Sequence, residues 1–282
     1  MTQPPDLDLD AALTALPVAL PPGRLVAADD GGEGNEGDGR EPLLWISDAP
    51  APAGLWARLH RAHPQTGLWP LLLSPLGDGP DYRPWLSGEL YPSQACAPDR
   101  YDPAALLHRW WEADGDGEEE AGHDDGDEDE LAEALAPYGR TWPGPAPAAD
   151  VPDGAAGAEA RELADVLQSV KDARLGLVRA GSGAEALAVC GWSGPVNHEN
   201  DIAKIAAVLA DWERRFGAQV VEVGFDTLRL SVPVPPATLA EALPLAAEHT
   251  ALCPDLVFQG AGRLTEYAEQ LVGARQWFFW WD

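Results

Sequence analysis

The sequence predicts an α+β protein, and three observations support this class. Apolar residues recur at three- and four-residue steps in several segments, which is typical of amphipathic helices. Short apolar or alternating runs stand between those segments and indicate strands. In the C-terminal part these patterns follow the order strand, two helices, two strands, two helices, strand. We therefore expect a split βαβ-like (βαββαβ) domain with a mainly antiparallel sheet.

The N-terminal region, residues 1–113, is predicted to be a smaller α/β unit. Its expected elements are strands at 43–46 and 68–73 and helices at 54–63 and 101–112. The last helix begins at Asp102-Pro103, since proline suits the first helical position. Pro70 predicts an edge position or a strand start for the second strand, because proline has no N–H to donate.

Two segments are too polar to join a hydrophobic core. Residues 29–41 contain no apolar side chain and predict a disordered loop. Residues 114–130 are almost entirely Gly, Asp and Glu, and such like charges favour an extended, disordered chain. The proline-rich run at 143–152 predicts a stiff spacer. The chain is thus divided into residues 1–113, an acidic and then Pro/Ala-rich linker at 114–157, and a C-terminal domain at 158–282.

The C-terminal region has the clearest patterns. Residues 200–216 predict an amphipathic helix whose apolar face consists of Ile202, Ile205, Ala206, Leu209, Trp212 and Phe216. Ser182 predicts a helix N-cap, and Thr238 with Glu241 predicts a capping box. The other expected elements are helices at 159–169, 182–190, 238–252 and 264–272 and strands at 174–179, 219–223, 227–234 and 276–281.

The last predicted strand is almost wholly aromatic. Its side chains alternate between two faces, with Trp277, Phe279 and Trp281 on one and Phe278 and Trp280 on the other. A strand that is apolar on both faces is normally covered, so we expect these residues in the core. An exposed aromatic platform for a partner is the alternative. The chain has twelve tryptophans, and we expect most of them to lie in the core or in a groove.

The charge limits the classes of partner. The formal net charge is −29 at pH 7, which disfavours nucleic acid and anionic membranes and leaves a basic protein as the expected partner. The same charge is also explained by solubility alone. The acidic tract does not form an EF-hand, because a loop that starts at Asp114 has Glu119 where glycine is required.

The cysteines, the first residues and the apolar runs indicate the cellular compartment in which the protein is expected. Cys96, Cys190 and Cys253 are widely spaced and contain no CxxC pair, so neither a disulfide framework nor a zinc finger is expected. The first residues are acidic and do not resemble a signal peptide. No run of about eighteen apolar residues is present. We therefore expect a cytoplasmic protein without a membrane partner.

Four runs of the C-terminal part resemble a known family. They are GWSGPVNHENDIAKIAAVLADWERRFGA, VGFDTLRLSV, AAEHTALCPD and the terminal WFFWWD. Together they resemble the bacterial family called domain of unknown function 4253, over roughly the last 110 residues. The resemblance implies a domain boundary but no activity, substrate or cofactor.

The candidate site residues are polar or aromatic members of these runs: Trp192, Asn197, Asp201, Asp226, Glu248, His249, Cys253 and Asp255. His249 and Cys253 are four residues apart, which places a base and a thiol on one helix face. Pro254 opposes this reading because it disfavours helical geometry at Cys253. The alternative is a small buried cysteine and a histidine that serves the helix C-terminus.

The loop before the 200–216 helix holds the second candidate group. This group consists of Trp192, Asn197, His198 and Asp201, and a loop that precedes a helix N-terminus can bind an anion. Helix capping, with Asn197 or Asn200 as the N-cap and Asp201 favoured by the helix dipole, explains the same residues. No third or fourth ligand has zinc-like spacing, so neither a metal nor a cofactor is predicted.

Two functions follow from these observations. The first is a non-catalytic interaction module, for example an immunity-type protein that binds a cationic partner. The alternative is an enzyme or small-ligand binder, with a polar pocket around Trp192, Asn197, Asp201, His249 and Asp255. The common sequence signatures of serine hydrolases, P-loop enzymes, dinucleotide binders and zinc proteases are absent from the chain.

Overall fold

The computed structural model describes residues 8–28, 41–77, 79–92, 97–113, 125–170 and 172–282, with the backbone alone for 125–129. Most of the predicted loop at 29–41, the first part of the acidic tract and Cys96 lie outside these residues. The described strands form one sheet in the order β1-β2-β4-β3-β5-β6-β7. Their bounds are β1 Gly23–Val26, β2 Leu44–Pro50, β3 Leu68–Leu73, β4 Arg174–Arg179, β5 Gln219–Val223, β6 Thr227–Ser231 and β7 Gln276–Trp280.

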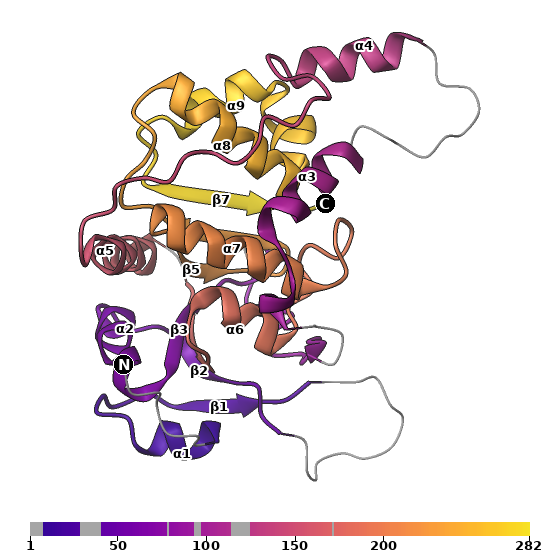
Figure 1. The fold of residues 1–282 in the computed structure, drawn as a ribbon. Coiled ribbons are helices and arrows are strands. Elements are labelled where there is room, and N and C mark those ends of the chain that lie inside the picture. Colours follow the sequence, from indigo (N-terminus) through magenta and orange to yellow (C-terminus); the bar gives the residue numbers. More distant parts are fainter. Residues whose placement is uncertain (1–7, 29–40, 78, 93–96, 114–124, 171) are drawn as a thin grey trace, which may run out of the picture.

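The sheet is antiparallel except between β3 and β5, which are parallel at Leu72–Glu222 and Leu73–Val223. This confirms the predicted α+β class with a mainly antiparallel sheet. Strand β4 lies between β2 and β3, so strands of the predicted N-terminal and C-terminal regions alternate in one sheet (Figure 1). The βαββαβ order is present along the chain, with β3 inserted in space between β4 and β5.

The helices of the described ranges include seven that lie close to predicted segments and two, α1 and α4, that were not predicted. They are α1 Leu9–Thr14, α2 Leu55–Thr66, α3 Pro103–Ala113, α4 Asp125–Ala134, α5 Ala155–Val170, α6 Gly183–Cys190, α7 Ile202–Phe216, α8 Leu239–Leu252 and α9 Leu264–Leu271. A short turn of 3-10 helix, η2, spans Pro98–Arg100, and a π-helical turn, η3, spans Leu256–Ala261. No helix in the described ranges combines the length and the apolar character that a membrane crossing requires.

The helices cover the two faces of the sheet. Side chains that alternate along a strand point to opposite faces, and on β3 Leu71 and Leu73 join one core whereas Leu68 and Leu72 join the other. The first core is closed by α3, α6, α7, α8 and α9, and the second by α1, α2 and α5. The candidate site residues lie on the face of the sheet that the first core covers.

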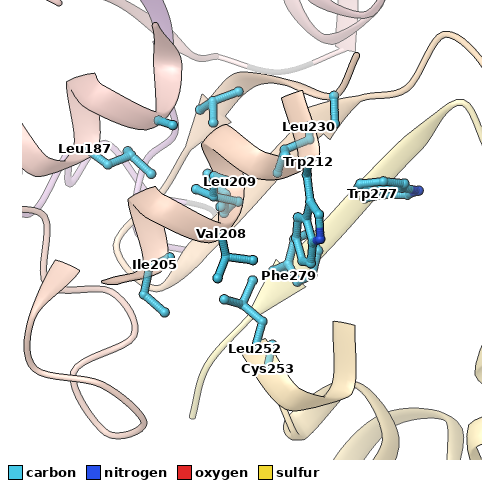
Figure 2. Close-up of a cluster of buried hydrophobic side chains, with 14 of the residues drawn as sticks. Leu187, Ile205, Val208, Leu209, Trp212, Leu230, Leu252, Cys253, Trp277 and Phe279 are labelled. Atoms are coloured by element: carbon cyan, nitrogen blue, oxygen red, sulfur yellow. The ribbon is translucent and has the colours of Figure 1, made fainter. Parts of the chain in front are cut away.

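Trp212 is central to the first core. It is fully buried in α7 and stacks on Phe279 of β7 with ring centroids 5.5 Å apart (Figure 2). Trp277 of β7 meets the same indole edge to face. Phe278, on the other face of β7, is 39% exposed. The predicted alternation of this strand is therefore confirmed. The expectation that both aromatic faces lie in the core is wrong at Phe278, because no residue of β7 joins the second core.

Both positions predicted from Pro70, a sheet edge or a strand start, are wrong, because Pro70 follows Leu68 and Trp69 within β3. Strand β3 lies inside the sheet, and Pro70 pairs with Leu177 of β4. The missing N–H is tolerated because the described pairing of β3 with β5 is confined to Leu72 and Leu73. Near Pro70, the Val220 carbonyl of β5 accepts a hydrogen bond from Trp69 Nε1 at 3.3 Å. A side-chain donor thus serves a carbonyl that a neighbouring strand would otherwise satisfy.

The segment between the two regions is structured where it is described. Residues 125–134 form α4, so this part of the acidic tract is helical rather than extended. The following chain, including the predicted spacer at 143–152, runs across α8 and α7 to α5 (Figure 1). We call residues 143–152 the Pro/Ala segment. Ala146 within it is 5% exposed.

Candidate functional site

The structure separates the candidate residues into two groups and one isolated residue. Glu248 and His249 are buried in α8. Trp192, Asn197, Asp226, Cys253 and Asp255 surround the chain at 280–282. Asp201 begins α7 and bonds to the η2–α3 connection. The residues therefore do not share a single pocket in the described part of the chain.

Glu248, Arg215 and Trp212 form a buried polar cluster that we call the Glu248 site. Glu248 Oε2 accepts from Trp212 Nε1 at 2.7 Å and from Arg215 Nη2, and Oε1 accepts from Arg215 Nη1 at 3.0 Å. Glu248 is fully buried, and Arg215 is 8% exposed. A buried charge requires such a paired, hydrogen-bonded arrangement.

The remaining bonds of the Glu248 site go to the Pro/Ala segment. Ala146 N donates to Glu248 Oε1 at 2.6 Å, and Ala146 O accepts from Arg215 Nη1 at 2.9 Å. Ala149 N donates to the Arg215 carbonyl at 3.0 Å. The carboxylate and the guanidinium together bind both main-chain groups of one residue.

His249 lies in an aromatic cage. Its ring is 4.8 Å from Trp212, 4.5 Å from Trp277 and 4.9 Å from Phe279 between centroids, and Nδ1 is 2.9 Å from the Tyr267 hydroxyl. Burial, with a smaller effect of the Arg215 charge, lowers the pKa of His249 well below its usual range. The imidazole is therefore neutral and fixed by packing.

The second group holds the chain at 280–282. Cys253 Sγ donates to the Trp280 carbonyl at 2.9 Å, and Asp255 Oδ2 accepts from Asp282 N at 3.0 Å. Asn197 Nδ2 donates to the Asp282 carbonyl at 2.9 Å. Asp226 contributes through its main chain, since its carbonyl accepts from Trp281 N at 3.1 Å. These contacts come from three separate segments, around residues 197, 226 and 253–255, and fix the end of β7.

Trp192 packs beneath the same chain. Its indole is 1% exposed and meets Trp281 edge to face at 5.8 Å. Trp192 Nε1 lies 3.0 Å from both the Gly224 and Phe225 carbonyls and donates to them. The residue thus links the loop before α7, the β5–β6 turn and the end of β7.

The Cys253 thiol is not arranged as a nucleophile. Burial raises its pKa above the ordinary value, whereas a reactive cysteine requires a lowered one. Its hydrogen bond goes to a carbonyl, and the Nδ1 atom of His249 bonds to Tyr267 instead. Burial likewise raises the pKa of Cys190 to about 12. Both described cysteines are free thiols.

Asp201 is itself the N-cap of α7, a position that the sequence assigned to Asn197 or Asn200. Its Oδ1 accepts from Ala203 N at 3.1 Å, and its Oδ2 accepts from the Tyr101 hydroxyl at 2.6 Å. That prediction of the cap residue is wrong because Asn197 turns away to Asp282. The predicted caps Ser182 and Thr238 are confirmed.

Two clefts lie near these residues. One, of about 260 Å³, is lined by Tyr91, Gly191, Trp192, Ser193, Val196, Asn200 and Ile202. A larger one, of about 730 Å³, lies between η2, α6 and α7 and contains none of the eight candidates. No group of three or more His, Cys, Asp or Glu in the described ranges is placed to hold a metal ion.

Sequence reasoning missed Arg215, Tyr101 and Ala146. Arg215 lies on the buried side of an otherwise apolar helix face, four residues after Asp211, with which it forms an ion pair. A cation at such a position signals a buried partner. Neither Tyr101 nor Ala146 has such a signal, because their partners are distant in the sequence.

The fold and these contacts define an α+β domain whose distinctive polar residues hold segments of its own chain. Residues 174–282 match the family model of the domain of unknown function DUF4253, which confirms the resemblance over this segment. The match begins at β4 and ends after β7. Comparison with curated proteins and with solved structures finds no match.

Replacing Trp192 with phenylalanine is expected to lower the unfolding free energy by about 2 kcal/mol, because the buried Gly224 carbonyl and the partly buried Phe225 carbonyl lose their indole donor. Urea denaturation measures the change. Trp142→Phe is the matched control, since Trp142 is only partly buried and its loss should cost less. Equal losses in the two variants would contradict the role given to the Trp192 N–H.

Proposed function

We propose that the protein is a non-catalytic interaction module that binds a basic protein. The side chains best suited to chemistry support this proposal. Glu248, His249 and Cys253 are buried and bonded within the protein, and burial keeps the thiol protonated. A base or nucleophile must instead reach a substrate atom.

The larger cleft is the observation that carries the proposal. Its apolar lining consists of small residues, namely Ala206, Ala207 and Ala210 of α7 together with Pro98 and Pro103. Such a lining suits the aliphatic stem of a lysine or arginine.

Acidic side chains line the same cleft. Asp99 and Glu185 are exposed there, and Asp211 is paired with Arg214 and Arg215. Together with the net charge of −29, the exposed carboxylates of Asp99 and Glu185 favour a cationic partner and speed its association. An immunity-type role, in which the partner is a basic toxin, is one form of this proposal. A cytoplasmic location belongs to it as well.

Affinity capture from the source cells at low and moderate salt tests the proposal. We expect a stoichiometric basic partner whose complex weakens at higher salt. Changing Asp99 to Asn and Glu185 to Gln should reduce the affinity about tenfold, which corresponds to 1.4 kcal/mol.

The matched control carries Glu162→Gln and Asp165→Asn on α5, where the same charge is removed from a different helix. Both control residues are exposed. A partner that binds both double variants equally would show that general charge, rather than the cleft, directs binding. Failure to recover any salt-sensitive basic partner would refute the proposal.

A small-ligand function is favoured by one observation, the cleft beside Trp192. Its volume of about 260 Å³ suits a single ring, and Ser193 and Asn200 offer polar groups at its wall. Screening small aromatic compounds by tryptophan fluorescence tests this second function. Saturable binding that Val196→Trp blocks, at an exposed residue of the cleft, would support it.

A further inference from the structure

The Pro/Ala segment is bound through its main chain. Within it, Ala146 gives its N–H to Glu248 and its carbonyl to Arg215, and Ala149 gives its N–H to the Arg215 carbonyl. The Ala146 side chain is 5% exposed. These are the contacts by which proteins bind extended peptides, where main-chain bonds provide affinity and small pockets provide specificity.

The sequence of the segment suits this mode of binding. Pro145 and Pro147 flank Ala146, and neither has an N–H. Ala146 therefore carries the one main-chain donor of the Pro-Ala-Pro unit, and that donor reaches Glu248. A proline also holds the preceding residue in an extended conformation, so little chain entropy is lost on binding.

The Glu248 site requires such a ligand. Its carboxylate has no exposure, and the Ala146 N–H is one of its four hydrogen bonds. Without the segment, a buried acceptor would lose a partner and a guanidinium donor would lose the Ala146 carbonyl. The site lies inside the matched family segment 174–282, whereas its ligand lies outside it.

We propose that the Glu248 site is a receptor for an extended Pro-Ala-Pro segment, which residues 145–147 fill within this chain. The same sequence binds in trans when the internal copy is removed. Asp211 of the acidic cleft pairs with Arg215, but no residue of the Pro/Ala segment lines that cleft, so the inference does not depend on the proposed function. The intact protein binds the peptide weakly, because the internal copy is present at a high effective concentration.

A full-length variant in which residues 143–147 are replaced by Gly and Ser, but with Ala146→Pro, tests the proposal, because the internal segment then lacks the N–H that Glu248 accepts. The probe is a labelled peptide with the sequence PGPAPAADVP, followed by fluorescence anisotropy. We expect the variant to bind it at least tenfold more tightly than the unaltered protein. A second peptide, in which proline replaces the central alanine of Pro-Ala-Pro, lacks the N–H and is expected to bind at least tenfold more weakly.

Thermal denaturation gives a second test of peptide binding, which also applies if the variant is destabilised. Loss of the internal segment should lower Tm, and 1 mM of the first peptide should restore part of it, because a ligand of the folded state stabilises that state. The proline-containing peptide should have no such effect. Failure of the first peptide both to bind and to raise Tm would overturn the proposal, as would equal effects of the two peptides.

Discussion

Replacement of Glu248 with alanine is expected to lower the unfolding free energy by about 3–5 kcal/mol, since breaking a buried ion pair is strongly destabilising. Arg215 then keeps Asp211 as its remaining carboxylate partner. The groups that lose Glu248 as a hydrogen-bond acceptor are the Arg215 guanidinium, the Trp212 indole N–H and the Ala146 N–H. Alanine is a good helix former, so the loss cannot be ascribed to the propensity of α8.

Urea denaturation measures this loss, with Glu162→Ala as the control. Glu162 is an exposed glutamate in the middle of α5, and its replacement should change the unfolding free energy by less than about 0.5 kcal/mol. Limited proteolysis should also cleave the Pro/Ala segment faster in Glu248→Ala than in the control. Similar stability and cleavage in the two variants would show that the Glu248 site does not hold the segment.

Acidification from pH 6.5 to pH 4 is expected to remove roughly 3 kcal/mol of unfolding free energy through His60 alone. Burial, followed by the charges of Arg161, His63 and Arg61, lowers the pKa of His60 from 6.5 to about 4. Below pH 6.5 the unfolded chain therefore takes up a proton that the folded protein does not, and the folded state loses stability until about pH 4.

Three other histidines act in the same direction. Burial lowers the pKa of His63, His198 and His249, and the effect is largest at His249. Neutralisation of surface carboxylates opposes this trend by relieving repulsion in a chain of net charge −29. A single melting curve against pH therefore mixes the two effects.

His60→Phe separates them. The phenyl ring can keep the stack on Trp56 and the edge contact with Trp69 but cannot take up a proton. Unfolding free energies of the variant and the unaltered protein, compared at pH 7.5 and pH 4, should show a smaller loss in the variant by roughly 3 kcal/mol. Parallel losses would contradict the assignment to His60.

The elements of the C-terminal part could be predicted because their signals are local. The apolar spacing of 202–216 and the alternation of 276–281 depend on residues within a few positions of one another. The neighbours of each strand could not be predicted, since β4 pairs on both sides with strands from the first 75 residues. No pattern within β4 specifies those partners.

The contacts of the candidate site residues could not be predicted. The family-like runs contain residues with specific contacts, such as Asn197 and Asp255, but a list of polar residues does not show what they bond. Their partners are the main chain at 280–282 and at Ala146. An alanine between two prolines has no chemical signal of its own, so the ligand of the Glu248 site emerges from the fold alone.

The position of β4 has a consequence for synthesis on the ribosome. Strands β2 and β3 emerge early, yet the strand that joins them emerges only after α3, α4 and α5. Contacts between residues so distant in sequence form slowly. The nascent chain therefore carries two strands with a gap between them until Arg174–Arg179 arrives, and this interval is when it most needs protection from aggregation by chaperones.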